Sequence, residues 1–313
     1  REAKTALIAV AEQTKELNAL LFVGLPYEHL GKLYNVAAAI NHGKILGLVP
    51  KTCIPNYGEF YEARHFARGM KQVEETQFLP ELRLPIGTDQ IFCCDQMPEL
   101  RVAAEICEDI WVPNPPSIAH AMAGADVIVN LSASNEVTGK DVYRKELVCG
   151  QSARLICGYI YASAGDGEST QDVVYSAHHM IAENGVVLQE AKRFANESIY
   201  AELDVQRLLA ERRKINTFAA GSREDYTQIA FHITKEETKL KRFIDPAPFV
   251  PNSKNDRDKR CEEILAIQSM GLKKRLAHTG CKHAVIGISG GLDSTLALLV
   301  TVKAYDLLGM DHK

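Results

Sequence analysis

A short run of small residues, placed between an apolar segment and a Leu- and Ala-rich segment, most constrains how this chain can fold. The run is Ser-Gly-Gly-Leu-Asp-Ser (289–294), and the residues before it, 284–288, predict a buried strand. Two glycines after a strand let the backbone turn tightly and approach a ligand closely. The N–H groups of this turn and of the following helix start then converge on one point, which favours an anion such as phosphate. A Walker A loop is excluded, because Gly-Lys-Ser/Thr is missing.

The rest of the chain alternates helical and strand patterns, which predicts an α/β fold. The expected helices span 5–17, 116–123, 144–156, 205–213 and 257–276. The expected strands span 20–25, 32–40, 44–49, 90–94, 101–106, 126–131, 159–164, 179–182, 186–190 and 199–203. Turn residues at 41–43 and 183–185 predict hairpins, so we expect a mixed sheet. A Pro-rich stretch at 245–251 predicts an extended linker.

Composition narrows the classes of function. A hydrophobic content of 46% and a charged content of 24% are typical of a soluble globular protein. The net charge of −4 gives no indication of a nucleic-acid or membrane partner. The eight cysteines include no Cys-x-x-Cys pair, so we expect no structural metal site and assume reduced thiols in a cytoplasmic protein. The sequence starts inside a helical pattern without Met and stops soon after Ser294, so we expect truncation at both ends.

Two further segments carry residue types that suit covalent catalysis. Lys51 follows an apolar strand, and Cys107 stands where another strand meets a loop. A cysteine on a sharp strand-to-helix turn can act as a nucleophile, and a nearby lysine would favour its thiolate. The lysine could also stabilise the oxyanion of a tetrahedral intermediate. Taken singly, Lys51 could be a solvated rim residue, Cys107 a core residue, and the acidic pair that follows it an ordinary loop.

Together the two segments resemble the nitrilase superfamily, whose members hydrolyse C–N bonds with a Glu-Lys-Cys triad. The sequences Lys-Thr-Cys-Ile-Pro-Asn-Tyr-Gly-Glu-Phe-Tyr-Glu (51–62) and Glu-Ile-Cys-Glu-Asp-Ile-Trp (105–111) are similar to the glutaminase domain of the glutamine-dependent NAD synthetase family. That family continues with a linker and a synthetase domain. The latter opens with the pyrophosphate loop of the ATP pyrophosphatases, which residues 289–294 resemble. The resemblance extends over essentially the whole chain.

The resemblance implies roles for single residues of the first domain. Cys107 would attack the side-chain amide of glutamine, form a thioester and release ammonia. Lys51 would hold the oxyanion, and Glu62 would be the positioning glutamate, with Glu59 close enough to compete. The residues implied to bind glutamine are Tyr57, Glu108, Ser134 and Lys140, and the last two could instead belong to a plain surface loop.

The resemblance also implies the chemistry of the second domain. The residues that would hold the ATP β- and γ-phosphates are Ser289, Gly290, Gly291, Asp293 and Ser294. Asp293 would orient the loop or assist Mg²⁺ rather than contact phosphate, because like charges repel. ATP would adenylate nicotinic acid adenine dinucleotide, and ammonia would displace AMP to give NAD. The implied cofactors are ATP and Mg²⁺, and the alternative is a generic Gly-Gly turn.

One departure from the family pattern concerns the general base, which in the family is a glutamate on a strand upstream of the lysine. Glu2, Glu12 and Glu16 are predicted on a helix face, and Glu28 in a turn, so we assign none of them. Loss of a general base typically costs about 10²–10⁴ in rate. We therefore expect this chain to be a poor glutaminase.

The predicted fold class is α/β, with three successive parts. Residues 1–235 are expected to form a nitrilase-type α-β-β-α sandwich, 236–260 a linker, and 261–313 the N-terminal part of a Rossmann-like adenine-nucleotide α-hydrolase domain. Two alternatives to glutamine-dependent NAD synthesis stay open: a stand-alone nitrilase-type amidase, and a non-catalytic fragment or assembly subunit. A homo-oligomer is implied by the resemblance, because nitrilase-type sheets pair across subunits.

Overall fold

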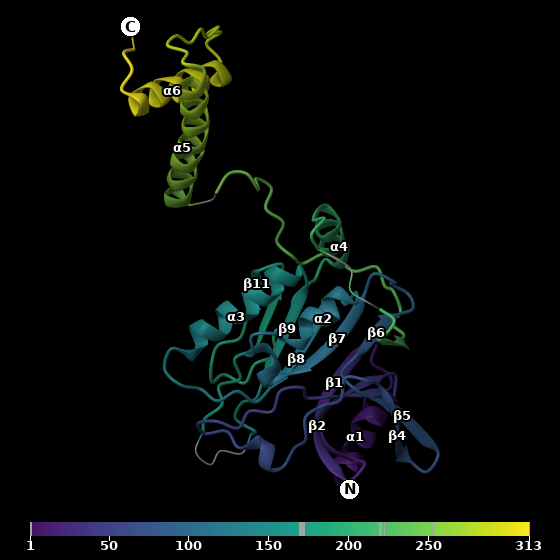
Figure 1. Cartoon of the computed structure of the whole chain (residues 1–313). Helices are drawn as coiled ribbons and strands as arrows, with labels where there is room; N and C mark the ends of the chain where they lie inside the picture. Colours follow the sequence, from purple (N-terminus) through teal and green to yellow (C-terminus); the bar gives the residue numbers. More distant parts are fainter. Residues whose placement is uncertain (1, 169–172, 219–220, 222, 252, 313) are drawn as a thin grey trace. The chain divides into compact units, whose positions relative to one another are not determined.

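The computed structural model divides the chain into two compact units, residues 1–242 and 243–313. It describes residues 2–168, 173–218, 221, 223–251 and 253–312. The first unit contains two β-sheets with helices on their outer faces, and Figure 1 shows how the strands of both sheets run between the helices. In the described part of the chain, no helix has both the length and the apolar character needed to cross a membrane.

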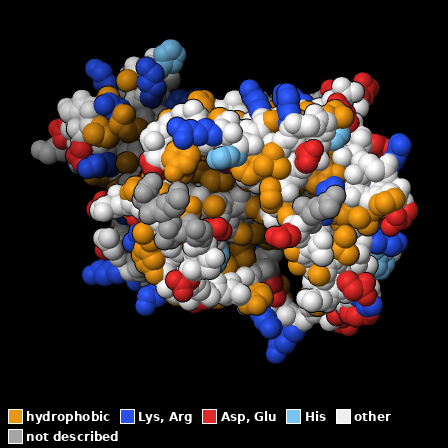
Figure 2. Space-filling model, turned by 90° about the horizontal axis from the view of Figure 1, so that it is seen from below, with side chains coloured by type: hydrophobic (Ala, Val, Ile, Leu, Met, Phe, Trp, Pro, Cys, Tyr) orange, Lys and Arg blue, Asp and Glu red, His pale blue; other side chains and the backbone are white. Residues whose placement is uncertain are grey.

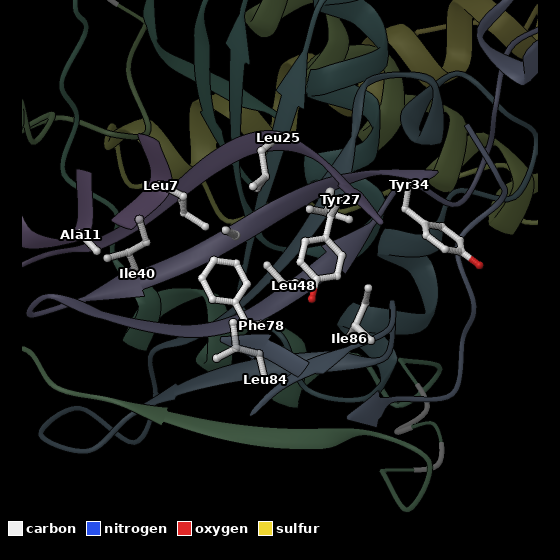
Figure 3. Close-up of a cluster of buried hydrophobic side chains, with 12 residues drawn as sticks. Leu7, Ala11, Leu25, Tyr27, Tyr34, Ile40, Leu48, Phe78, Leu84 and Ile86 are labelled. Carbon is white, nitrogen blue, oxygen red and sulfur yellow. The ribbon is translucent and has the colours of Figure 1, made fainter. Parts of the chain in front are cut away.

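The first sheet has five strands in the order β1-β2-β3-β5-β4. Their bounds are β1 Leu20–His29, β2 Lys32–Asn41, β3 Lys44–Pro50, β4 Glu74–Leu79 and β5 Leu82–Ile86. Helix α1, Glu2–Gln13, covers the outer face, because its apolar side chains at Leu7 and Ala11 are buried against the strands. Figure 3 shows these two residues beside Tyr27, Ile40 and Phe78, which come from the sheet.

The second sheet has seven strands in the order β11-β10-β9-β8-β7-β6-β12. Their bounds are β6 Gln90–Cys94, β7 Arg101–Ile106, β8 Val127–Ser132, β9 Gly158–Ser163, β10 Met180–Glu183, β11 Val186–Glu190 and β12 Thr227–Phe231. Strands β7, β8 and β9 are parallel to one another, so their carboxyl ends meet at one edge of the sheet. The helices of this half of the sandwich are α2 Pro116–Met122, α3 Lys140–Leu155 and α4 Val205–Lys214.

Apolar side chains from both sheets form a shared core. Ala39 and Val49 from the first sheet pack in one buried cluster with Phe92, Val102 and Val127 from the second. A separate cluster under α3 includes Val148 and Tyr159. The order of layers is therefore helix, sheet, sheet, helix, and the predicted α-β-β-α sandwich is confirmed for the first unit.

The described part of the second unit contains two helices, joined by residues 280–291. Helix α5 spans Lys254–Thr279, and α6 spans Leu292–Leu308. They contact each other through a small cluster of Leu276, Ala304 and Tyr305. The side chain of Ser253 caps α5 by accepting from the N–H of Asp256 at 3.1 Å.

Several expectations about single elements are wrong. Residues 284–288 form no strand, and Val285 is 99% exposed. A strand needs a neighbour to pair with, and the described part of this unit contains no other strand. Residues 199–203 also form no strand, and the first helix ends at Gln13 rather than 17. Glu28 lies within β1 and not in a turn, because β1 pairs with β2 as far as His29.

Three strands were not expected from the sequence. Strands β4 and β5 form a hairpin in the first sheet, and β12 joins the second sheet beside β6 in parallel register. The pairing of β12 with β6 joins residues far apart in the sequence, so the local pattern around 227–231 gave no signal for it. Helix α5 begins at Lys254, inside the range 236–260 assigned to a linker.

Candidate active site

Cys107 directly follows the last residue of β7 and begins the short helix η2, Cys107–Ile110. Its φ of +46° lies in the left-handed region, which costs free energy for a residue with a Cβ. The Cys107 N–H donates to Oδ1 of Asn130 on β8 at 3.0 Å. A neighbouring strand therefore holds the sharp turn that carries the sulfur.

Asn130 belongs to a buried chain of polar groups beneath this turn. Its Oδ1 also accepts from Oγ of Ser132 at 2.7 Å, and its Nδ2 donates to the Tyr159 hydroxyl at 3.1 Å. The Tyr159 hydroxyl donates in turn to the Glu105 carboxyl. Burial raises the pKa of Glu105 to about 7, so this carboxyl holds a proton over much of the acidic range.

Asp109 connects the cysteine turn to the segment that follows Lys51. Its carboxylate accepts from the N–H groups of Ile106 at 2.8 Å and Cys53 at 2.7 Å. A third, longer bond comes from the N–H of Thr52 at 3.4 Å. Burial raises the pKa of Asp109 to about 6. Asp109 thus joins the segment after Lys51 to the turn that carries Cys107, and is not part of an ordinary acidic loop.

Lys51 is buried, with only 3% of its surface exposed, and is not the solvated rim residue that one interpretation suggested. Its ammonium forms an ion pair with the Glu62 carboxylate, which stands at the start of helix η1, Glu62–Arg64. The other Glu62 oxygen accepts from Nδ2 of Asn35 at 3.0 Å. These contacts fix the direction in which the Lys51 ammonium points.

One cavity of about 1180 Å³ brings the predicted residues together. Every residue predicted for catalysis and glutamine binding lines it: Lys51, Tyr57, Glu62, Cys107, Glu108, Ser134 and Lys140. Hydrophobic side chains border a hollow in the face of the molecule shown in Figure 2. The cavity is large enough for a small-molecule ligand.

The charges in this cavity act on Cys107 in opposite directions. Burial raises the pKa of the Cys107 thiol, the nearby Lys51 ammonium lowers it, and Glu62 raises it. The thiol is therefore protonated at rest near neutral pH, and a nucleophilic attack by sulfur requires a group that removes the proton.

The side of the cavity formed by residues 134–140 presents polar groups against aromatic rings. Ser134 is 3% exposed, so it does not belong to a plain surface loop. Lys140 Nζ donates to Oδ1 of Asn135 at 2.6 Å and lies 5.1 Å from the Trp111 ring centroid. Burial lowers the pKa of Lys140. Nδ2 of Asn135 donates to the Glu59 carboxylate, so Glu59 is occupied there while Glu62 pairs with Lys51.

Tyr57 and Glu108 form the rim of the cavity. The Tyr57 hydroxyl, in the loop after β3, donates to Oε1 of Glu108 in η2 at 2.7 Å. Burial and the Glu108 carboxylate raise the pKa of Tyr57. This contact joins the loop after β3 to the cysteine turn at the cavity entrance.

None of the upstream glutamates considered as a general base reaches the cavity among the described residues. Glu2, Glu12, Glu16 and Glu28 are exposed and do not line it. The carboxylates that do line it are Glu59, Glu62, Glu108 and Glu168. Asn135 binds Glu59, Lys51 pairs with Glu62, and Tyr57 donates to Glu108.

The polar groups that support the cysteine turn were not predicted from the sequence. Asn130 was counted in an apolar strand, and Glu105 and Tyr159 received no role. One signal was present: an amide inside the otherwise apolar run 126–131 needs a hydrogen-bond partner once buried. The contact between the Trp111 ring and Lys140 had no such signal in the sequence, because it depends on how the loop before α3 is folded.

The residues predicted to hold ATP phosphates lie at the start of α6. Gly290 has a φ of +83°, and Gly291 is the N-cap residue of the helix. The Ser289 and Ser294 hydroxyls lie 3.4 Å apart, and the Ser289 N–H donates to Oγ of Ser294 at 3.3 Å. The loop therefore gathers hydroxyls at a helix N-terminus. Within the described residues, no group of three or more His, Cys, Asp and Glu side chains is arranged to hold a metal ion.

Fold and site together define a C–N hydrolase of the nitrilase type: two sheets between helices, with a cysteine and a lysine–glutamate pair facing one cavity. The chain belongs to the carbon-nitrogen hydrolase family, whose model matches residues 2–213.

Curated relatives extend the similarity beyond this domain. The "Glutamine-dependent NAD(+) synthetase" of Mycobacterium tuberculosis is 38% identical over 97% of this chain and 46% of its own length. The human protein of the same name is 26% identical over 92% of this chain and 42% of its own. The predicted resemblance is thereby confirmed. The chain spans about half the length of the curated relatives it matches.

Solved structures agree with this assignment. A glutamine-dependent NAD(+) synthetase from Cytophaga hutchinsonii is 28% identical with a TM-score of 0.53, covering 61% of this chain and 30% of that one. A carbon-nitrogen hydrolase from Helicobacter pylori, at 19% identity and a TM-score of 0.53, covers 68% of this chain and 70% of that one. At this identity the second likeness supports the fold alone.

Proposed function

We propose that the first unit hydrolyses the side-chain amide of glutamine at Cys107 and supplies ammonia for an ATP-dependent amidation of nicotinic acid adenine dinucleotide to NAD. One observation carries the glutaminase step: Cys107, held in a left-handed turn at the end of β7, shares a cavity with the buried Lys51 and its ion-pair partner Glu62. The similarity to NAD synthetases over nearly the whole chain supports the second step.

The proposed chemistry assigns one task to each group. Sulfur attacks the amide carbon, and the carbonyl oxygen becomes an oxyanion beside the Lys51 ammonium. The proton that the Cys107 thiol loses is transferred to the amide nitrogen. The intermediate then collapses, expels ammonia and leaves a thioester on Cys107. Water then cleaves the thioester to release glutamate. Glu62 positions Lys51, because its two oxygens are held by Lys51 and Asn35.

Glutamine would be held by the polar groups around the cavity. Tyr57 and Glu108 stand at the rim, where they suit the charged amino-acid end. Ser134 and Lys140 lie on the wall beside Trp111. We expect the 313-residue chain to be slow, since the upstream glutamates do not line the cavity in the described structure and the Cys107 thiol is protonated at rest.

The second unit would bind ATP at residues 289–294. The exposed N–H groups, the two serine hydroxyls and the N-terminus of the 17-residue helix α6 suit phosphate oxygens. When bound, ATP supplies the activating adenylyl group. Asp293, in the first turn of α6, would assist a Mg²⁺ ion that neutralises phosphate charge. A homo-oligomer remains part of the proposal, from the family resemblance.

A direct test uses the full chain with glutamine and follows both ammonia release and the intact mass. A mass increase at Cys107, absent in Cys107→Ser, would support the thioester step. Lys51→Met is expected to accumulate less of the adduct, because the oxyanion loses its cation. Ammonia release that is unchanged in Cys107→Ser would refute the proposed site.

The stand-alone amidase and the assembly subunit are separated from this proposal by two measurements. An amidase would release ammonia from simple amides and show no binding of ATP. An assembly subunit would neither be labelled at Cys107 by a thiol-reactive glutamine analogue nor release ammonia. Binding of ATP that is lost in Ser289→Ala/Ser294→Ala supports the synthetase half.

A further inference from the structure

A second cavity lies at the amino end of β7, the strand whose carboxyl end leads to Cys107. It has a volume of about 500 Å³ and is lined by the start of β7, the turn between α2 and β8, and residues in and after α4. Strand β7 runs from Arg101 in this cavity to Ile106, next to Cys107. The described residues that line the two cavities do not overlap, so this second cavity is separate from the candidate active site.

Basic groups outnumber acidic ones around this cavity. The basic residues are Arg101, Arg212, Arg213 and Arg223, and the acidic residues are Glu99 and Asp126. Glu99 already accepts from Nε2 of Gln206 at 2.9 Å. The cavity therefore carries an excess of positive charge in its described lining.

Arg212 and Asp126 form the structural floor. Arg212 Nη1 donates to Oδ1 of Asp126 at 2.8 Å, and its Nη2 donates to the Ala125 carbonyl at 2.8 Å. Its Nε donates to the carbonyls of Leu155 and Ile156. Each nitrogen of this guanidinium therefore donates a hydrogen bond. Its partner Asp126 is the only buried carboxylate in the described lining.

Arg101 and Arg223 converge without such a partner. A Cβ built on Gly124, which has a φ of +109°, would lie 3.2 Å from Nη1 of Arg101 and 3.2 Å from Nη2 of Arg223. A side chain at this position would push both groups aside by a few tenths of an ångström, and the positive φ would strain it. Within the described part of the chain, neither guanidinium forms an ion pair. The charge of the Asp126 carboxylate acts on both, but this carboxylate is bonded to Arg212. Two like charges held together in this way repel each other, and an anion between them would remove the repulsion.

We propose that this cavity binds the phosphate group of a small organic phosphate monoester. Guanidinium groups hold phosphate oxygens through paired N–H donors, and two of them match a dianion better than a single negative charge. The volume exceeds that of phosphate alone and lies in the range of small-molecule sites. Apolar side chains of Met122, Leu209, Ile215 and Phe218 line the remainder, so the ligand carries an apolar or aromatic body next to its phosphate.

Calorimetric titration of the full chain with three probes at constant ionic strength tests the proposal. The probes are phenyl phosphate, inorganic phosphate and benzoate. Phenyl phosphate is expected to bind most tightly, inorganic phosphate more weakly, and benzoate at least about ten-fold more weakly than phenyl phosphate, because it carries a single charge. Equal binding of benzoate would refute the phosphate class.

Two variants and one matched control locate the binding. Arg101→Gln and Arg223→Gln are each expected to weaken phenyl phosphate by about ten-fold or more. Arg223 is exposed on a loop, so its substitution leaves the fold intact. Lys214→Gln removes a charge from the end of the same α4 region, where Lys214 pairs with Glu211, and should leave binding unchanged.

The outcomes that overturn the proposal are distinct. Absence of binding by the unaltered chain up to about 10 mM phenyl phosphate would exclude a useful site, since such affinity is near the weakest that is specific. Binding that persists in both arginine variants would place the phosphate elsewhere. If it is then lost in Ser289→Ala/Ser294→Ala, the loop before α6 is the binding site.

Discussion

Oδ1 of Asn130 accepts a hydrogen bond from the N–H of Cys107 at 3.0 Å, so the residue that holds the Cys107 turn comes from the neighbouring strand β8. Because the Cys107 N–H already donates to Asn130, it is not free to stabilise an oxyanion. The oxyanion role therefore falls on Lys51 in the proposed mechanism, and the amide of Asn130 acts as a positioning group.

The first prediction concerns Asn130→Ala. The substitution removes the acceptor of the Cys107 N–H, so the left-handed turn loses its support and the sulfur moves. We expect labelling of Cys107 by a thiol-reactive glutamine analogue to slow by about 10²-fold. The unpaired buried groups should also lower the free energy of unfolding by about 1–3 kcal/mol.

A matched control separates reactivity from stability. Asn41→Ala removes another buried amide, which does not line the cavity and whose Nδ2 donates to the carbonyls of Ala19 and His232. It should cost a similar amount of stability and leave the labelling rate unchanged. Equal slowing in both variants would show that Asn130 acts only through stability.

The second prediction concerns the thiol of Cys107. Lys51 lowers its pKa and Glu62 raises it. Lys51→Met should therefore move the midpoint of Cys107 alkylation to higher pH, and Glu62→Gln should move it to lower pH. Iodoacetamide labelling across a pH series, mapped to Cys107 by peptide mass spectrometry, measures both. A shift of the two midpoints in the same direction would contradict the arrangement of charges.

The sequence predicted local features well and long-range ones poorly. The bounds of β6 and β7 coincide with those expected, since turn residues and apolar runs define each strand locally. Strand β12 was missed because its partner is β6, and the expected strand 284–288 is absent because no described strand pairs with it. In the site, Lys51, Glu62 and Cys107 were expected from motifs. Asn130 depends on parallel pairing of β7 with β8, which places it opposite Glu105.

The third prediction concerns the pH dependence of stability through Glu105. Its pKa is raised from 4.5 to about 7 in the folded chain, so the folded state holds a proton that the unfolded state has lost. The stabilisation is fully present below about pH 4 and is lost as the pH rises through about 7. At one pKa unit per 1.36 kcal/mol, the effect is on the order of 3 kcal/mol.

Glu105→Gln isolates this contribution. Burial also raises the pKa values of Asp109 and Asp126 to about 6, so these two carboxyls also contribute to the pH dependence of stability in the unaltered chain. As the pH rises from 4 to 7, the free energy of unfolding should fall more in the unaltered chain than in Glu105→Gln. Denaturant unfolding at fixed pH values measures it, and a constant difference would contradict the raised pKa.

The last prediction compares two adjacent residues on α3. Arg144 is 1% exposed and donates to Oε2 of Glu136 at 3.0 Å and to the carbonyl of Asn135 at 3.3 Å. Arg144→Met keeps the aliphatic volume but leaves Glu136 buried without this cation. We expect a loss of about 3–5 kcal/mol in the free energy of unfolding. Asn135 should also lose its fixed position, and with it the contacts to Lys140 and Glu59, so glutamine-analogue labelling should weaken.

Lys145→Met is the control for this comparison. Lys145 pairs with Glu190 at 2.6 Å, but both side chains are substantially exposed, so water screens the pair. The expected change in stability is below about 1 kcal/mol, because exposed ion pairs contribute little. Urea unfolding of the two variants measures the difference. Similar values for both would mean that Arg193, which already pairs with Oε1 of Glu136 at 3.5 Å, is a sufficient partner for this carboxylate.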